Sequence, residues 1–155
     1  MKTLYLMCGM PFSGKTTLAQ SIAKYLHAPY ISLDDINEFR GLFGGDGIPV
    51  EEWEKTHSIA IQQLQNLMLS QQDIVLDDTS CFRWLRDRYR DFSIKYNYET
   101  ILIYLDVPVS EIHSRTEEND KTQDRRGVRQ EIVSEMAKMF ELPQSDETVI
   151  KYGPN

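Results

Sequence analysis

The hydrophobic and polar positions of the chain follow two alternating patterns. Short apolar runs predict strands at 3–8, 30–33, 74–76, 101–105 and 148–151. Apolar residues at helical spacing predict helices at 16–25, up to 39, at 50–70, around 85–92, from 108 onwards and around 132–140. Parallel strands need helical crossovers, and apolar strands need cover on both faces. The alternation therefore predicts an α/β fold with a mostly parallel sheet.

Two segments interrupt this pattern. Residues 41–49 are rich in glycine and predict a loop, and residues 117–127 carry no apolar side chain and predict an exposed loop. The sequence has no internal repeat and no interdomain linker, and its 155 residues are the length of one domain. We therefore expect a single domain over residues 1–155.

The segment from Gly9 to Thr16 reads GMPFSGKT and fits the P-loop pattern G-x-x-x-x-G-K-[ST]. It lies between a predicted strand and a predicted helix, as the motif requires. Glycine lets the backbone turn its N–H groups towards phosphate, and the helix start adds its positive end. Lys15 is expected to reach the β- and γ-phosphates, and the Thr16 hydroxyl to bind magnesium. The expected nucleotide-binding positions are Gly9, Pro11, Ser13, Gly14, Lys15, Thr16 and Thr17.

Three of the predicted strands end in aspartate. In open parallel sheets ligands bind beyond the carboxyl ends of the strands, so Asp34, Asp78 and Asp106 are expected around one crevice. Asp34 and Asp35 would lie across it from the P-loop, where a carboxylate accepts the proton of an attacking hydroxyl. An aspartate at such a junction also commonly caps the next helix. We assign proton acceptance to Asp34, and capping or substrate contact to Asp35.

Asp78 follows the run DIVLD, a hydrophobic strand that ends in acid. Beside a P-loop such an acid commonly holds magnesium or its water shell, although this ending occurs in many α/β proteins. We assign Asp78, together with Thr16, to the metal.

Arginines are concentrated in two places. Arg83 and Arg86 follow the third strand, where they could face a substrate, whereas Arg88 and Arg90 further along the same helix fit a solvated, ion-paired face. Arg115, Arg125 and Arg126 flank or occupy the segment 117–127. A loop that carries arginine can close over phosphates and stabilise the transferred charge, and the alternative is a charged surface loop. We interpret this segment as a lid.

The charge, the cysteine spacing and the length of the apolar runs limit the cellular location and the partners that we expect. A net charge of −7, from 24 acidic and 17 basic residues, opposes long-range attraction to nucleic acid. Cys8 and Cys81 have no metal-ligand spacing, and no apolar run approaches the roughly 20 residues that cross a bilayer. We expect a cytoplasmic protein with neither membrane contact nor an extended nucleic-acid surface. His27, His57 and His113 fit helix faces and are interpreted as structural.

The motifs GMPFSGKTT, SLDD, VLDDTS, LDVPVSEIHSR, RRG and FELP occur in an order and spacing that extends over nearly the whole chain. On these residues the chain resembles small P-loop kinases, in particular the 5′-hydroxyl polynucleotide kinase domain and the wider zeta-toxin and chloramphenicol-phosphotransferase group. Members of this group are often described only as AAA-type ATPases. The resemblance implies a three-layer P-loop NTPase fold with a five-stranded sheet. It also implies Asp34 as general base, Asp78 as strand-end acid, and Arg115 and Arg126 as phosphate-binding arginines.

Two positions differ from the polynucleotide kinase pattern. Asn37 stands where those kinases have an arginine three residues after the catalytic aspartate, and Arg40 lies one helical turn further on. Ser80 replaces the asparagine of their DTN motif. The shared motifs therefore identify a reaction better than they identify a substrate.

These observations predict an ATP- and Mg²⁺-dependent phosphotransferase that moves the γ-phosphoryl group to a hydroxyl of a small molecule or a nucleic-acid 5′ end. Lys15 and Arg126 would neutralise the transferring group, Arg125 would add a nucleotide contact, and Asp34 would deprotonate the acceptor. The alternative is a nucleotide-dependent switch or regulatory ATPase whose only acceptor is water. The acceptor, the choice between ATP and GTP, and the oligomeric state stay open at this point.

Overall fold

The computed structural model describes residues 1–42, 47–123 and 128–153. Its strands are β1 (Lys2–Cys8), β2 (Tyr30–Ser32), β3 (Ile74–Asp77), β4 (Tyr98–Leu105) and β5 (Val149–Tyr152). Its helices are α1 (Lys15–Leu26), α2 (Leu33–Phe39), α3 (Val50–Leu69), α4 (Arg83–Lys95), α5 (Val109–Thr122) and α6 (Gln130–Met139). In this described part of the chain, no helix is both long enough and apolar enough to cross a membrane.

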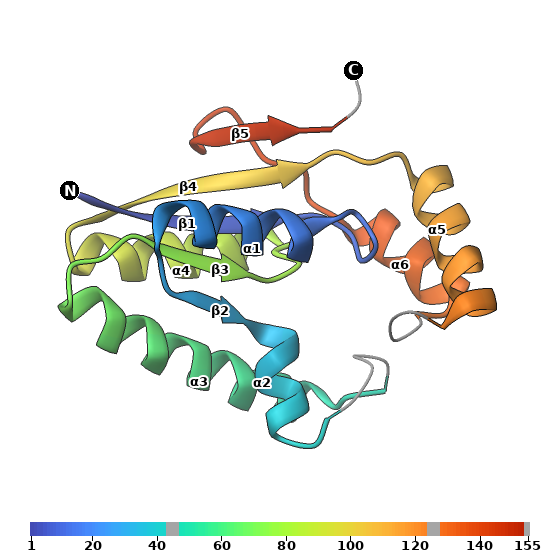
Figure 1. Ribbon diagram of the computed structural model, residues 1–155, viewed down its shortest axis with the longest axis horizontal. Coiled ribbons are helices and arrows are strands. Elements are labelled where there is room, and N and C mark those ends of the chain that lie inside the picture. The colour runs from blue at the N-terminus through green and yellow to red at the C-terminus, as the bar shows by residue number, and fades with distance from the viewer. Residues whose placement is uncertain (43–46, 124–127, 154–155) are drawn as a thin grey trace.

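The strands form one five-stranded sheet in the order β2-β3-β1-β4-β5, and every pairing is parallel. The predicted α/β fold with a five-stranded sheet is confirmed. From β1 the chain first builds the β3 side of the sheet and then crosses to β4 on the other side (Figure 1). The carboxyl end of β1 is therefore a topological switch point, which is where open sheets bind ligands.

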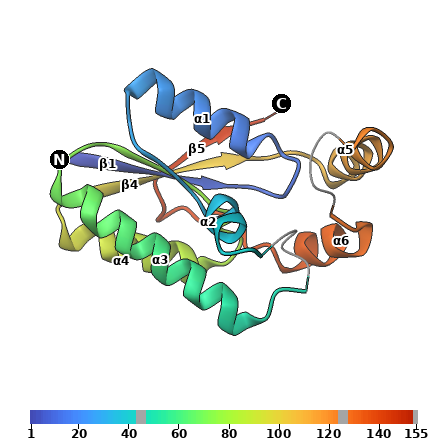
Figure 2. The same ribbon diagram turned by 60° about the horizontal axis from the view of Figure 1, so that its bottom comes forward.

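Helices cover both faces of the sheet, as Figure 2 shows, with α1 on one face and α3 and α4 on the other. Alternate strand residues point to opposite faces. Met7 and Val75 pack with Ala19 of α1 in one buried cluster. Leu6 and Leu76, their neighbours in sequence, pack in the cluster that contains helices α3 and α4. The helices α2, α5 and α6 lie at the carboxyl ends of the strands (Figure 2).

The loop predicted for 117–127 is wrong in its first part, because α5 continues to Thr122. The inward face of α5 consists of Ile112, Thr116 and Asn119, which are buried at helical spacing. Only Ile112 is apolar, so hydrophobic periodicity gave no signal beyond it. The Thr116 hydroxyl donates a hydrogen bond to the Ile112 carbonyl of the same helix at 2.8 Å, so this buried donor is paired.

A buried ion pair connects α4 with the segment that leads into β5. The Arg86 guanidinium donates to Glu147 Oε1 at 2.8 Å, to the Ser80 carbonyl at 3.0 Å and to the Leu142 carbonyl at 3.4 Å. Burial raises the pKa of Glu147, but hydrogen bonds from Arg86 and the Gln144 amide outweigh it, so the pKa lies below its usual value. The pair thus holds both charges in a place that water does not reach.

Replacement of Arg86 by methionine is expected to lower the free energy of unfolding by at most about 3–5 kcal/mol. The buried Glu147 would lose its hydrogen-bonded cation and keep only Arg90 at 3.4 Å and Arg83 at 3.7 Å. The measurement is urea unfolding followed by circular dichroism. The double variant Arg86→Met/Glu147→Met should recover most of the loss, since no charge is then unpaired. Equal stability of the parent and the Arg86→Met protein would show that the pair contributes nothing.

Candidate nucleotide and acceptor site

The P-loop connects β1 to α1 at the switch point of the sheet. A Cβ atom on Gly9 would come within 2.9 Å of Ser13 Oγ and 3.3 Å of Leu105 Cβ, so glycine is needed there. Gly14 has φ 93°, a left-handed conformation that glycine adopts readily. The Gly9 N–H donates to the Thr79 carbonyl at 3.1 Å, which fixes the loop against the segment after β3.

Several P-loop positions are arranged to receive phosphate. Ser13 is buried, and its Oγ has no hydrogen-bond partner among the described residues. A buried hydroxyl is rarely left unpaired in a native protein, so this atom fits a ligand oxygen. Thr17 is exposed in the first turn of α1, and Pro11 is half-buried in the loop. The cradle therefore fits a nucleoside triphosphate.

Asp77, the last residue of β3, organises the base of this cradle. Its Oδ2 accepts hydrogen bonds from Thr16 Oγ1 and from the Tyr30 hydroxyl, both at 2.7 Å, and its Oδ1 lies 3.9 Å from Lys15 Nζ. Burial raises the pKa of Tyr30, and the contact with Asp77 raises it further, so the phenol remains a donor. Hydroxyl and carboxylate oxygens are the ligands that Mg²⁺ prefers. Thr16 and Asp77 are thus side chains that could hold a magnesium ion.

The described residues contain no cluster of three or more histidine, cysteine or acidic side chains that would hold a metal unaided. This agrees with the way Mg²⁺ binds in phosphoryl-transfer sites. There the ion keeps several waters and takes its other ligands from one or two protein oxygens and the substrate phosphates.

Asp78, to which the sequence analysis assigns the metal, points to the other face of the sheet. Its Oδ1 accepts from the Thr79 N–H at 2.8 Å, and its Oδ2 accepts from the Tyr89 hydroxyl at 3.1 Å. His57 Nδ1 lies 3.9 Å from Oδ2. Burial raises the pKa of Asp78, against the opposing charges of His57 and Lys15. The structure therefore places Asp77, and not Asp78, beside Thr16.

Sequence reasoning missed Asp77 although a signal for it exists. Successive strand residues alternate between the two faces, so Asp77 shares a face with Val75 and Asp78 shares one with Leu76. Val75 packs in the α1 cluster. An acid that is to meet Thr16 at the start of α1 must lie on that same face.

Asp34 and Asp35 are exposed in the first turn of α2. The cap of this helix is the Ser32 hydroxyl, which accepts from the Asp35 N–H at 3.2 Å, so the capping role considered for Asp35 belongs to Ser32. Burial raises the pKa of Asp35, and the charges of Glu38, Asp34 and Asp77 add to this effect. Neither aspartate carboxylate is needed to cap its own helix.

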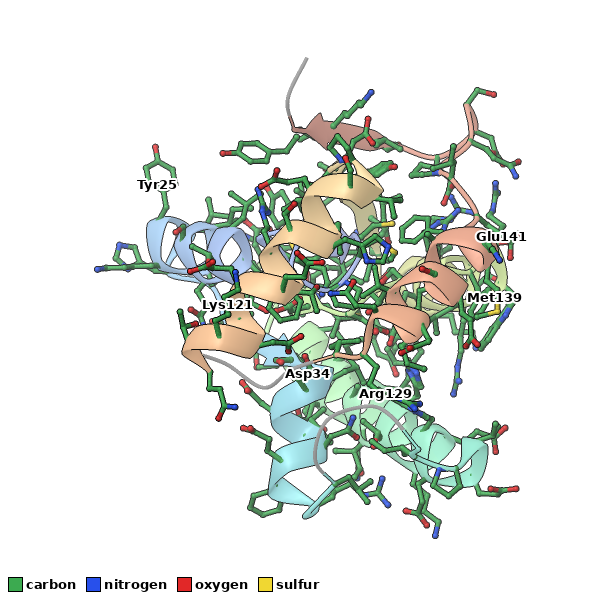
Figure 3. All side chains as sticks on the ribbon, turned by 90° about the vertical axis from the view of Figure 1, so that its right-hand side faces the viewer. Tyr25, Asp34, Lys121, Arg129, Met139 and Glu141 are labelled. Carbon is green, nitrogen blue, oxygen red and sulfur yellow. The ribbon has the colours of Figure 1, made fainter. Side chains whose placement is uncertain are left out.

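Figure 3 views the molecule from the carboxyl ends of the strands. In this view Asp34 lies at the start of α2, between Arg129 and the end of α5 that carries Lys121. The acidic start of α2 therefore lies on the side of the molecule where α5 and α6 are found.

Arg115 connects α5 to the P-loop. Its Nη1 donates to the Phe12 carbonyl at 2.8 Å, and its Nε donates to Glu111 at 3.1 Å. The side chains of Met10 and Phe12 are buried with Ile112 of α5 and with α6 in a separate apolar cluster. The tip of the P-loop is thus anchored on the two helices that flank the expected lid. Arg125 and Arg126 lie outside the described residues.

Arg83 and Arg86 are turned towards acids on the C-terminal segment. Arg83 donates to Asp146 at 2.7 Å and to Asp87 at 2.8 Å, and Arg86 is buried on Glu147. Arg83 and Arg86 thus have the ion-paired arrangement that was expected for Arg88 and Arg90. The substrate role expected for them finds no geometric support.

Residues 4–143 match the family model described as "AAA domain", and the chain therefore belongs to that family. A comparison with curated proteins finds no match.

Three solved structures with the same fold come from different proteins. A sugar kinase from Janibacter sp. HTCC2649 has a TM-score of 0.71 at 17% identity, covering 99% of this chain and 85% of its own. Kti12 of Chaetomium thermophilum, solved with ADP-AlF3, has a TM-score of 0.71 at 19% identity, covering 96% and 89%. The Pnkp1/Rnl/Hen1 RNA repair complex gives a TM-score of 0.74 at 18% identity, covering 89% of this chain and 43% of the matched one. The resemblance to small P-loop kinases is confirmed at the level of the fold.

Proposed function

We propose that the protein is an ATP- and Mg²⁺-dependent phosphotransferase that acts in the cytoplasm on a hydroxyl group. The observation that carries the proposal is the convergence of Thr16 and Lys15 on Asp77 at the P-loop, with two exposed aspartates at the start of α2. The P-loop residues support binding of a nucleotide and its metal. The aspartates at the start of α2 support the presence of a carboxylate that can serve an acceptor.

Different side chains would have different roles in the transfer. Ser13 Oγ, the P-loop N–H groups and Lys15 would bind the phosphate oxygens, and Arg115 would add a positive charge from α5. Mg²⁺ held at Thr16 and Asp77 supplies charge neutralisation at the β- and γ-phosphates. The acceptor oxygen attacks the γ-phosphorus, its proton passes to the Asp34 carboxylate, and ADP leaves. Arg126, and Arg125 beside it, would act from the lid on the transferring group.

Catalysis of this kind depends mainly on positioning and on charge stabilisation. The buried contacts of Asp77 and the Ser32 cap give both halves of the site fixed positions. The acceptor is a small molecule or a nucleic-acid 5′ end.

Transfer of labelled γ-phosphate from ATP into a cell extract tests the proposal. The extract is separated afterwards into nucleic-acid and small-molecule fractions, and the Lys15→Ala protein is the control. Label in either fraction that depends on Lys15 supports a kinase. Release of free phosphate alone would contradict it and favour a switch or regulatory ATPase.

A further inference from the structure

A small polar cluster that contains one histidine lies beside the phosphate site, on the face of the sheet that α3 and α4 cover. His57 of α3, Tyr89 of α4 and Asp78 at the end of β3 come together there. Tyr89 is fully buried, and the side chains of His57 and Asp78 are 13% and 9% exposed. Asp78 directly follows Asp77, whose Oδ1 lies 3.9 Å from Lys15 Nζ, and directly precedes Thr79, whose carbonyl accepts from the Gly9 N–H at 3.1 Å. The cluster therefore adjoins the P-loop and its phosphate-binding lysine.

The hydrogen-bond directions in this cluster determine what His57 offers to a ligand. The single proton of the Tyr89 hydroxyl is donated to Asp78 Oδ2 at 3.1 Å. The Tyr89 oxygen, 3.1 Å from His57 Nδ1, must then accept from an Nδ1–H group. In the neutral form of His57 the single ring proton is therefore on Nδ1, and Nε2 carries a lone pair. This Nε2 atom has no partner in the described part of the chain and is free to accept a hydrogen bond.

The start of α3 is held rigidly against α2. Arg40 donates to the Glu52 carbonyl and to Thr56 Oγ1, both at 2.8 Å, and forms an ion pair with the Glu52 carboxylate. Thr56 Oγ1 donates to Asn37 Oδ1 at 2.6 Å. His57 directly follows Thr56, so it is positioned by the same contacts that position α2 and its Asp34.

These contacts also give a structural role to the first departure from the polynucleotide kinase pattern, in which Asn37 replaces an arginine and Arg40 lies one turn further on. Asn37 is buried and engaged by Thr56, and Arg40 is directed at α3 and neutralised by Glu52. On the described wall formed by α2 and α3, no arginine is left for the phosphate of a nucleic-acid end. An aromatic ring is present instead, because Trp53 lies one turn before His57 with its ring centroid 6.1 Å away.

We propose that His57 is an acceptor-binding residue, with Nε2 accepting a hydrogen bond from a hydroxyl and Trp53 covering the apolar side of the ligand. The acceptor is then a small polyhydroxylated compound that carries no phosphate. A hydroxyl can donate to Nε2, whereas phosphate oxygens would meet a lone pair backed by the Asp78 carboxylate. Sugars fit this pattern, because they combine many hydroxyl donors with an apolar C–H face. The inference rests on the proposed phosphotransferase function.

A pair of substitutions separates the two nitrogen atoms of His57. Asparagine at this position keeps a donor near Nδ1 for Tyr89 but has nothing at Nε2, whereas glutamine extends an amide oxygen to the place of Nε2. His57→Asn is expected to raise the KM for the acceptor about tenfold or more, as the loss of one substrate hydrogen bond in a sheltered site implies. His57→Gln should recover part of this loss. The KM for ATP and the thermal unfolding midpoint should stay close to those of the parent in both variants.

The probes are glycerol, ribose, glucose, inositol and adenosine, tested beside ribose and glucose phosphate monoesters and a 5′-hydroxyl oligonucleotide. Transfer is followed with labelled ATP, and binding is followed by Trp53 fluorescence in a Trp84→Phe background. Trp84 is 59% exposed on α4 and stacks on Phe82. The expected result is fluorescence change and transfer with an uncharged compound, preferred over its phosphate ester and weakened by His57→Asn.

The other outcomes refute the role of His57, the proposed phosphotransferase function, or both, and they can be told apart. Transfer to the oligonucleotide or to a phosphate ester, or transfer to a sugar that His57→Asn leaves unchanged, refutes the role of His57 while the phosphotransferase stands. ATP hydrolysis with no transfer and no fluorescence change for any probe refutes both. Fluorescence change that depends on His57 without any transfer supports the acceptor site and refutes the phosphotransferase.

Discussion

Replacement of Asp34 by asparagine is expected to reduce phosphoryl transfer about 10²–10⁴-fold while ATP binding stays nearly normal, because the acceptor would lose the group that takes its proton. The amide has nearly the same shape as the carboxylate and cannot act as a base. Asp34 is exposed, and Ser32 supplies the cap of α2, so the fold should tolerate the change. The measurement is kcat for transfer beside the dissociation constant of a fluorescent ATP analogue.

Asp35→Asn is the matched control. Both aspartates lie in the first turn of α2, so each substitution removes the same favourable interaction with the helix dipole, about 0.3–1 kcal/mol. Any effect of lost helix stability is therefore common to the two proteins. Transfer by the Asp34→Asn protein at the parent rate, or an equal loss in the Asp35→Asn protein, would remove Asp34 from the role of base.

The parts of the fold and site that the sequence predicts are those encoded locally. The P-loop is contiguous, and the strand before it and the helix after it are visible in the apolar pattern, so Lys15 and Thr16 could be placed without a structure. The parallel sheet follows from the alternation of strands and helices. The order of the strands depends on contacts between segments far apart in sequence, and composition carries no direct signal for it.

The sequence did not predict which face of the sheet an aspartate occupies, nor which polar side chains are buried. Asp77 and Asp78 are adjacent and chemically identical, and only the packing of β3 against α1 separates their environments. Arg86 is charged and would ordinarily be assigned to the surface, yet Glu147, distant in sequence, makes its burial possible. Thr116 and Asn119 are polar but lie on the buried inner face of α5, and the polar run that contains Asn119 predicted an exposed loop instead.

The histidines show the same limit. His57 fits a helix face and has no ligand spacing in the sequence, and its interpretation as a structural residue rested on these two observations. Its environment comes from three separate elements, α3, α4 and the end of β3. The direction of each hydrogen bond gives the imidazole a free acceptor atom, and that information exists only once the three elements are assembled.

Asp77→Asn is expected to lower kcat/KM for transfer by on the order of 100-fold or more and to raise the Mg²⁺ concentration needed for half-maximal activity. The amide can still accept hydrogen bonds from Thr16 and Tyr30, so the local structure should persist. The negative charge that offsets Lys15 and attracts the cation is lost. Titration of activity with Mg²⁺ at saturating ATP measures the effect.

Asp78→Asn changes the neighbouring carboxylate in the same way and serves as the comparison. Because Asp78 accepts from Tyr89 and faces His57, we expect its replacement to affect the KM for the acceptor and to leave the Mg²⁺ requirement unchanged. Comparison of Asp77→Asn with Asp78→Asn thus distinguishes the aspartate that contacts the metal from the one that acts on the acceptor. A Mg²⁺ requirement that rises in Asp78→Asn and not in Asp77→Asn would reverse the assignment of the two aspartates.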